Sequence, residues 1–191
     1  GTTISNVTFP ITATISGPGT LGINTAANVA SIASAGRAVT GTTGHYAIGV
    51  FSDGTAGVAT VTISTGTTVL ATETVTFYGA AAKITPTVVN SVLAIGANVG
   101  PITAVVTDAA GVLVPGATVY AVSGTAAAVS NSYTSCGASS ASGAVTCDLA
   151  GVAAGSAAIT LTLNSSSTGT STVSVLAGTM RVSDGVATKV D

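Results

Sequence analysis

Apolar and polar residues alternate along much of the chain with a period of two. Val58–Ser64 places Val61 and Ile63 on one side of an extended segment and hydroxyl side chains on the other. The same alternation recurs in three further segments: Thr72–Phe77, Ala157–Leu163 and Thr170–Val175. Strands of an antiparallel sheet with one solvated face have this pattern. The pattern therefore predicts an all-β chain.

Clusters of glycine, proline and aspartate separate these segments. They occur at Gly17–Gly19, Ser52–Gly54, Asp108–Gly111 and Pro115–Gly116. These residue types supply the backbone conformations that tight turns need. Short strands with such turns roughly every 8–12 residues are typical of a sandwich or barrel.

Two segments raise other interpretations. Asn24–Ala35 is rich in alanine and spaces Val29 and Ile32 as a helix would, with a loop or a short edge strand as alternatives. The mean hydropathy of +0.72 suggests a membrane span, for which Val88–Val106 is the best candidate. Asparagine, glycine and Pro101 interrupt that segment before it reaches the roughly 20 apolar residues of a transmembrane helix. We expect no membrane span.

A repeated motif predicts the domain organisation. Gly79–Thr85 and Gly185–Asp191 both read Gly-x-Ala-x-Lys-aliphatic. Upstream, four positions of one unit match four of the next at a constant spacing: Gly57, Val61, Ile63 and Val75 with Gly155, Ile159, Leu161 and Val173. The repeat predicts one domain over 1–79, a second over 80–184, and the start of a further repeat or a tail at 185–191. Such repetition is the signature of a tandem array. It also predicts that Tyr78 and Gly79 end the last strand of the first domain, and that Lys83 lies in the first strand of the second.

Composition excludes several classes of function. Threonine, serine, alanine, valine and glycine fill 139 of the 191 positions, and charged residues make up 5% against about 25% in an average soluble domain. With one histidine and six acidic residues, the chain has too few groups for acid–base chemistry or metal ligation, so we expect no enzyme and no cofactor. Four Lys and Arg residues with a net charge of −2 cannot neutralise a run of phosphates, which excludes nucleic acid as a partner.

Val105–Tyr120 resembles the central strands of bacterial Ig-like domains of the invasin/intimin type. It contains an Asp-x-x-Gly hairpin at Asp108–Gly111 followed by a Val-Pro-Gly strand start at Val114–Gly116. Ser139–Leu163 is similar to the later strands of that family, and the first domain resembles a divergent relative through Ser16–Gly19, Phe51–Gly57 and Thr76–Gly79. The composition is similar to that of surface-layer and cell-surface fibre proteins. The resemblance implies an all-β fold of two tandem Ig-like antiparallel β-sandwiches.

Two motifs suggest chemistry at first reading. Gly17–Gly22 fits Gly-x-Gly-x-x-Gly, but a dinucleotide site also needs a helix after the loop and an acid about 20 residues further on, whereas the first acid is Asp53. A glycine turn between strands is the better interpretation. His45 opens a predicted strand, where we expect it to face solvent; a zinc ligand or pH sensor at a contact between copies is the alternative.

Four aspartates stand singly beside turn residues: Asp53, Asp108, Asp148 and Asp184. We expect them to form turns, and no metal site is predicted. Calcium held between distant turns and backbone carbonyls is the alternative. Glu73 and Lys83 suggest an isopeptide cross-link, but a single glutamate cannot serve each unit, and we do not expect one.

Cys136 and Cys147 flank a polar segment rich in glycine and serine, with no further thiols and no Cys-x-x-Cys spacing. We predict a structural disulfide between them, with two buried free thiols as the alternative. Closing a loop of this length stabilises by roughly 2–3 kcal/mol. Disulfides persist in oxidising compartments, which favours an extracellular location at the cell surface.

Glycan attachment and glycan binding have weak support. Asn6 and Asn164 begin N-glycosylation sequons, which arise by chance in so hydroxyl-rich a chain. The tyrosines are dispersed, so we expect them to pack in cores or junctions: Tyr46, Tyr78, Tyr120 and Tyr133.

These observations favour a structural repeat segment of a self-assembling extracellular surface protein, in a surface layer or a fibre. The predicted partners are copies of the same chain, with a cell-envelope glycan as a further candidate. The alternatives are an adhesin or carbohydrate-binding Ig-like module, and an Ig-like appendage of a phage virion. Strand edges without Lys or Pro to guard them would invite pairing between copies. Gly1–Phe9 is expected to pair within its own domain or to complete a sheet in a neighbouring copy.

Overall fold

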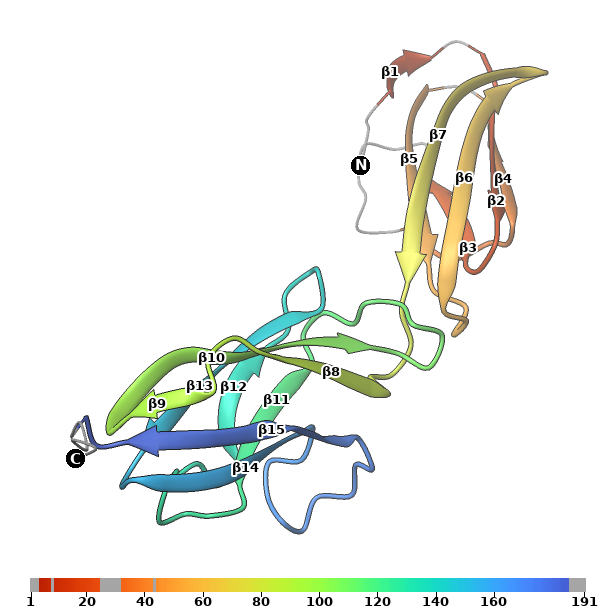
Figure 1. Cartoon of the computed structure of the whole chain (residues 1–191). Coiled ribbons are helices and arrows are strands. Elements are labelled where there is room, and N and C mark those ends of the chain that lie inside the picture. The colour runs from red at the N-terminus through yellow and green to blue at the C-terminus, as the bar shows by residue number, and fades with distance from the viewer. Residues whose placement is uncertain (1–3, 8, 25–31, 43, 186–191) are drawn as a thin grey trace, which may run out of the picture. The chain divides into compact units, whose positions relative to one another are not determined.

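The computed structural model describes residues 4–7, 9–24, 32–42 and 44–185, with the backbone alone described at 4–7 and 44–46. These residues form strands, turns and coil, with no helix among them, which confirms the predicted all-β fold. The chain divides into two compact units, Gly1–Gly79 and Ala80–Asp191. Each unit consists of two facing layers of strands (Figure 1).

Unit 1 contains seven described strands: β1 (Ile4–Val7), β2 (Ile11–Ser16), β3 (Thr20–Asn24), β4 (Ala38–Gly41), β5 (Gly44–Phe51), β6 (Gly57–Thr65) and β7 (Thr68–Phe77). Sheet I has the order β4-β2-β6-β7 and sheet II the order β1-β5-β3, with every pairing antiparallel. The alternation in the sequence decides which side chains face inward: Ile11, Ala13 and Ile15 of β2 are buried between the sheets, while the hydroxyl residues between them face outward.

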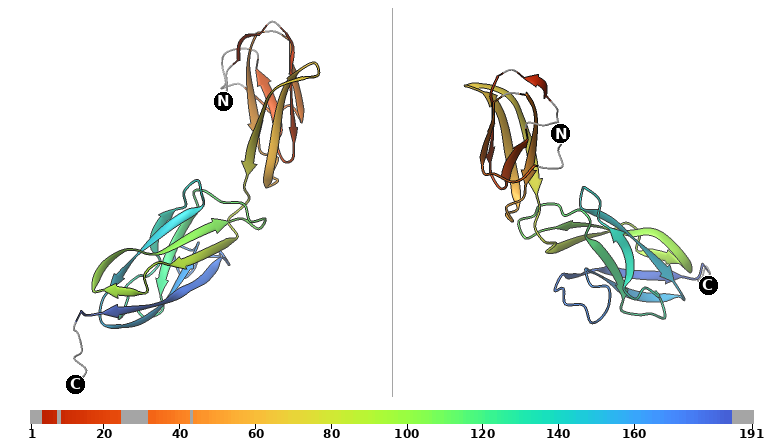
Figure 2. Two further views of the ribbon diagram at one scale, coloured as in Figure 1. Left: turned by 45° about the horizontal axis from the view of Figure 1, so that its top comes forward. Right: turned by 180° about the vertical axis from the view of Figure 1, so that it is seen from behind.

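Unit 2 contains eight strands: β8 (Lys83–Val88), β9 (Val92–Ala94), β10 (Gly96–Thr107), β11 (Thr118–Ser123), β12 (Thr134–Ala138), β13 (Ala144–Gly151), β14 (Gly155–Thr162) and β15 (Ser174–Ser183). Sheet III has the order β13-β10-β8 and sheet IV the order β12-β11-β14-β15-β9. The core between them includes Ile102, Leu149, Ile159, Leu161 and Met180. Figure 2 shows both units from two further sides.

The first strand of unit 2 changes sheet. β8 pairs antiparallel with β10 in sheet III, and after Val89–Ser91 the chain continues as β9, which pairs parallel with β15 in sheet IV. Leu93 of β9 is 1% exposed, so this short strand is anchored in the core. The crossing closes one side of the sandwich.

Several sequence predictions can be compared with these bounds. Val58–Ser64 lies within β6 with Val61 buried as predicted, whereas the strand predicted over Thr170–Val175 begins only at Ser174. The Asn164 side-chain amide bonds the backbone of Ser171 through both its atoms, which holds the preceding residues in a loop. The predicted helical segment falls mainly on residues 25–31, outside the described residues, as do residues 186–191 of the predicted further repeat.

The strand ends and edges agree with the prediction in part. β7 ends at Phe77, one residue before Tyr78, whereas β8 begins at Lys83 as predicted. β1 pairs with β5 of its own unit, the first of the two arrangements expected for the N-terminal segment. The expectation of edges without Lys or Pro is wrong for β8, because this outer strand of sheet III carries both Lys83 and Pro86.

Among the described residues, no helix has the length and apolar character that a membrane span requires.

Candidate functional surface

The glycine loop of unit 1 is a structural turn. Gly17 and Gly19 have φ angles of 84° and 95°, and the loop leads from β2 into the strand β3, where a dinucleotide site would need a helix. The Arg37 guanidinium donates hydrogen bonds to three backbone carbonyls of this region, those of Ile15 (2.9 Å), Gly17 (2.7 Å) and Gly19 (3.3 Å). Carbonyl oxygens that converge in this way can bind a cation, and here the cation is an arginine side chain.

Asp53 holds the same loop from the other side. Its carboxylate accepts the Gly19 N–H at 2.8 Å and the Thr55 N–H at 2.9 Å. The Gly19 N–H, followed by that of Thr55, lowers the pKa of Asp53 from its ordinary value, because these hydrogen bonds favour the charged form.

The aspartates of unit 2 have comparable partners. Asp108, buried in its turn, accepts the N–H groups of Ala110 and Val112, and Asp148 accepts that of Gly100 on β10. Asp184 is exposed directly after β15. Within the described part of the chain, no three His, Cys, Asp or Glu residues gather closely enough to hold a metal ion. The described hydrogen bonds give Asp53 and Asp108 the turn-forming role that their sequence context indicates. The expectation is wrong for Asp148, which lies within β13 and binds Gly100 where the pairing of β10 with β13 is irregular. His45 lies in β5, and its side chain is outside the described part.

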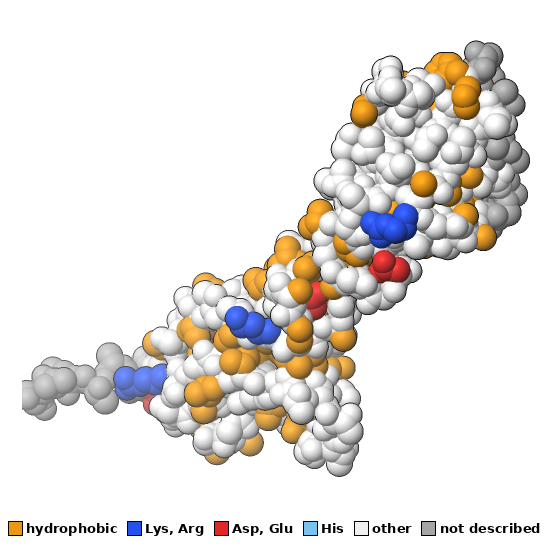
Figure 3. All heavy atoms as spheres, turned by 90° about the vertical axis from the view of Figure 1, so that its right-hand side faces the viewer, with side chains coloured by type: hydrophobic (Ala, Val, Ile, Leu, Met, Phe, Trp, Pro, Cys, Tyr) orange, Lys and Arg blue, Asp and Glu red, His pale blue; other side chains and the backbone are white. Residues whose placement is uncertain are grey.

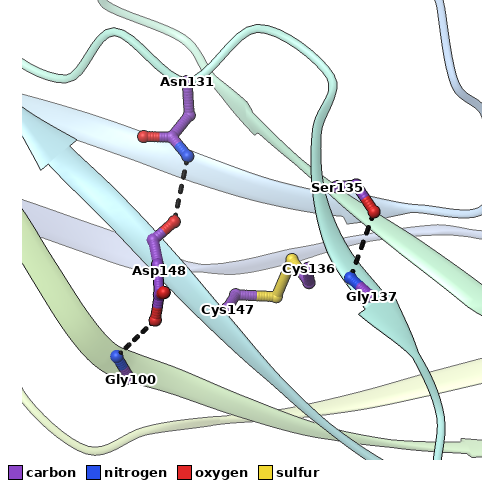
Figure 4. Close-up of a disulfide and its surroundings, with 7 residues drawn as sticks. All are labelled: Gly100, Asn131, Ser135, Cys136, Gly137, Cys147 and Asp148. Atoms are coloured by element: carbon purple, nitrogen blue, oxygen red, sulfur yellow. Dashed lines mark hydrogen bonds between the residues drawn. A yellow bond between two sulfur atoms is a disulfide. The ribbon is translucent and has the colours of Figure 1, made fainter.

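Cys136 and Cys147 form a disulfide with an S–S distance of 2.07 Å (Figure 4). Cys136 lies in β12, at the edge of sheet IV, and Cys147 lies in β13, at the edge of sheet III. The cysteines are therefore strand residues, and the polar segment between them forms the turn from β12 to β13. Cys147 is fully buried in the core, a position that the polar setting in the sequence does not indicate. The bond closes the side of the sandwich opposite to β9.

Asparagine side chains act in place of backbone groups in unit 2. Buried Asn131 donates to the carbonyl of Asp148 and accepts the N–H of Ala150, so its amide pairs with the outer edge of β13 (Figure 4). Asn164 makes the equivalent pair with Ser171. Both groups of the Asn164 amide are thus engaged within the fold, which opposes glycosylation at this sequon.

Sheet I presents a broad hydroxyl surface to solvent. Cross-strand neighbours on its outer side, such as Thr14 with Thr62 and Thr62 with Thr72, form rows across three strands. We call this surface the threonine face; it consists of Thr12, Thr14, Ser16, Thr40, Thr60, Thr62, Ser64, Thr72, Thr74 and Thr76, with Ala38, Val58 and Val69 on the same side. None of these side chains is charged. Figure 3 shows one side of the molecule, on which charged side chains are few.

Arg37 and Asn131 were missed at the sequence level. Arg37 is the only arginine or lysine in unit 1 and follows a glycine, which is a usable signal for a carbonyl-binding role. Asn131 stands among serines with no pattern that marks it. Its role depends on β13, which it meets only in the folded chain.

The fold and these surfaces define a pair of Ig-like β-sandwiches, the second of them cross-linked between its sheets. No family model and no curated protein matches the chain. Among solved structures, it is similar to domains 1–6 of the surface layer protein SbsC, with 19% identity over 89% of this chain and a TM-score of 0.40. It is also similar to invasin, a bacterial integrin-binding protein, with 16% identity over 93% of this chain, 32% of that chain and a TM-score of 0.39. It is similar as well to the D0–D1 domain of intimin, with 15% identity over 94% of this chain, 83% of that chain and a TM-score of 0.35.

The chain spans about a fifth of the length of the SbsC fragment, with 20% of that fragment covered. Surface-layer and invasin/intimin-type proteins, the groups that the sequence resembles, are thus among the solved structures similar to this chain.

Proposed function

We propose that this chain is a non-catalytic structural segment of an extracellular protein that assembles with copies of itself at the cell surface. The observation that carries the proposal is the threonine face of sheet I. It is a regular surface of small, uncharged side chains across four strands, and it is compatible with a second copy of itself.

The chemistry of the hydroxyl group supports this pairing. Each hydroxyl both donates and accepts hydrogen bonds, so the hydroxyl groups of two identical threonine faces can pair with one another. Burying a charge between proteins is costly unless the charge is paired, and this face has no charge to bury. The threonine methyl groups add apolar contact area. Two copies can therefore form a symmetric contact to which each contributes the same face.

The size of the face sets the strength of a single contact. Strands about 4.8 Å apart and roughly 20 Å long give a face of roughly 400 Å². A stable pair of proteins buries about 800 Å² on each partner. One face-to-face contact is therefore weak, and stable assembly needs many such contacts in a lattice or filament.

The disulfide supports the location. It joins the two sheets of unit 2 through Cys147, which is fully buried, so the fold of this unit includes the oxidised pair. Disulfides form and persist in secreted and surface proteins.

The experiment is electron microscopy of the purified protein with a variant at the centre of the face. Thr62→Lys places a charge where Thr14 and Thr72 are the neighbours, and we expect it to abolish ordered assemblies that the unaltered chain forms. Thr168→Lys adds the same charge in an exposed loop and serves as the control. Assemblies that persist in the Thr62→Lys variant contradict the role of this face, and a dispersed protein that binds glycans favours the carbohydrate-binding alternative.

We further propose that the two units belong to a longer tandem series in which residues 185–191 begin the next unit. The shared Gly-x-Ala-x-Lys motif at Gly79 and Gly185 supports this proposal. The mass of the native protein tests it: a mass near 17.9 kDa contradicts a longer series, and a mass well above that value supports one.

A further inference from the structure

β7 is the longest strand at the edge of a sheet in the described part of the chain. It runs for ten residues, and its one neighbour in sheet I is β6. The outer side of such a strand presents a row of backbone donors and acceptors, which is a template for a strand from another molecule. The two edge strands of sheet III are blocked by other means: Lys83 and Pro86 on β8, and the Asn131 amide on β13.

β7 carries the only glutamate of the chain, Glu73. Glu73 stands directly opposite Val61 of β6, which is 5% exposed, so the two side chains lie on the same, core-facing side of sheet I. Val75 and Phe77 lie on this side as well and are partly buried in the core of unit 1. Glu73 itself is exposed. A charged side chain thus occupies the apolar side of the sheet, at its edge.

The regular part of β7 centres on this residue. The pairing with β6 passes from Ile63 opposite Ala71 to Ser64 opposite Val69, so Leu70 is an extra residue and forms a bulge. Bulges bend a strand and disrupt pairing. A partner strand therefore has residues 71–77 to pair with, and Glu73 lies within that stretch.

We propose that β7 is a latent pairing edge for β7 of a second copy, and that Glu73 holds this edge closed. In an antiparallel pair of identical strands, residues on the same side of the sheet face one another. The register with the greatest overlap of residues 71–77 places Glu73 opposite Val75 of the other copy, with the two carboxylates on a diagonal of about 7–8 Å. A shift by two residues places Glu73 opposite either Glu73, with the carboxylates facing each other, or Phe77, with each carboxylate against an aromatic ring.

Two physical costs then oppose the pair. Like charges facing each other across strands are destabilising. Extending sheet I would also bring each carboxylate against the partner's apolar side, where an unpaired charge is expensive. An uncharged residue at this position removes both costs and leaves the backbone template intact. This inference is independent of the threonine face, which lies on the opposite side of sheet I.

The test compares Glu73→Thr with Asp184→Asn, which changes the net charge by the same amount at an exposed position of unit 2. Self-association is measured by sedimentation equilibrium, both in the otherwise unaltered chain and in the Thr62→Lys background, where face-to-face assembly is blocked. We expect Glu73→Thr to associate roughly tenfold or more tightly than its parent in both backgrounds. Asp184→Asn should match its parent. Equal association of Glu73→Thr and its parent overturns the proposal. Failure of Thr62→Lys to block ordered assembly affects only the proposed function.

A mixing experiment identifies the partner strand. Glu73→Lys keeps a charge at the edge and should remain as dispersed as its parent when alone. Mixed with the parent, this variant brings its introduced ammonium group against the Glu73 carboxylate of the other copy, and the mixture should associate more tightly than either component. A mixture that behaves like its separate components overturns β7 as the partner. Circular dichroism of each variant verifies the fold, which this exposed position should leave unchanged.

Discussion

At the scale of single residues, polar side chains complete the backbone hydrogen bonding of a chain with few charges. The Arg37 guanidinium donates hydrogen bonds to three carbonyls in and beside the glycine loop, and the Asn131 amide pairs with the edge of β13. Serines accept the N–H two residues on, as Ser52 does from Gly54 and Ser135 from Gly137. Small polar side chains can fix turn conformations through such bonds, so this fold needs few large residues to define its turns.

Asn131→Ala tests the value of one such bond pair. The change removes two part-buried hydrogen bonds, those with the N–H of Ala150 and the carbonyl of Asp148, and each such bond contributes about 0.5–1.5 kcal/mol. Guanidinium unfolding measures the loss. The exposed neighbour Ser132 provides the control, since Ser132→Ala should change stability by less than about 0.5 kcal/mol. Equal stabilities of the two variants would show that the Asn131 amide is dispensable.

Asp53 predicts a pH dependence for unit 1. Its pKa is lowered in the folded protein, so its contribution to stability is fully present above the ordinary aspartate pKa of about 3.9. That contribution is lost as the pH falls through the lowered pKa of the folded state. We expect Asp53→Asn to be less stable than the parent at pH 7 and the difference to shrink below pH 4, as measured by denaturant unfolding at several pH values. A difference that does not vary with pH would contradict this role.

At the scale of elements, a covalent link between the two sheets of unit 2 closes each side of the sandwich, through the backbone on one side and a disulfide on the other. β9 crosses to sheet IV on one side, and the disulfide joins β12 to β13 on the other. Sheets I and II carry no disulfide, because the chain has only these two cysteines. The two units therefore differ in how their sheets are held together.

Removal of the disulfide should lower the stability of unit 2 selectively. Replacing both Cys136 and Cys147 by alanine is expected to cost roughly 2–3 kcal/mol through the added freedom of the unfolded chain. The loss of the buried sulfur of Cys147 adds a packing cost. Differential scanning calorimetry of the variant, and of the parent with and without reductant, should show the transition of unit 2 moving to lower temperature. A shift confined to unit 1, or no shift, would contradict this account.

At the scale of the whole molecule, most charged side chains of the described residues lie at loops and edge strands, with Arg181 on the inner strand β15 as the exception, and the threonine face is uncharged. Arg37 and Asp53 hold a turn, and Glu73 and Lys83 stand on outer strands. In the proposed assembly, contacts between copies then depend on hydroxyl groups, methyl groups and backbone, with little contribution from ion pairs.

The proposed assembly should resist salt. Ion pairs weaken as salt screens them, whereas apolar and hydroxyl contacts do not. We expect assemblies to persist in about 1 M NaCl, where the Debye length is only about 3 Å, and to dissociate in guanidinium chloride, as followed by light scattering. Dissociation by moderate NaCl contradicts the account. Dissociation by a calcium chelator alone would indicate that a metal site at the aspartate-bearing turns holds the copies together.

The sequence by itself determined the class of fold and the sidedness of many strands. In a sheet with a single buried face, an alternating strand must place its apolar residues on the buried side and its hydroxyl residues on the other. Val61 and Ile159 could therefore be placed in the core from the local pattern alone. Turn residues mark the ends of strands for a similarly local reason. The glycine loop and the turn-forming aspartates followed from such short-range preferences.

Only the tertiary structure decided which strands meet and which lie at an edge. Cys136 and Cys147 flank a polar segment in the sequence, and only the structure shows that they lie on outer strands of opposite sheets, because strand order depends on contacts between distant segments. Glu73 becomes an edge charge on the apolar side only through its register with Val61, and Asn131 becomes a backbone partner only beside β13. Pairing of distant strands is the collective outcome of burial and register over a whole unit, and it leaves no mark on the residues nearby in sequence.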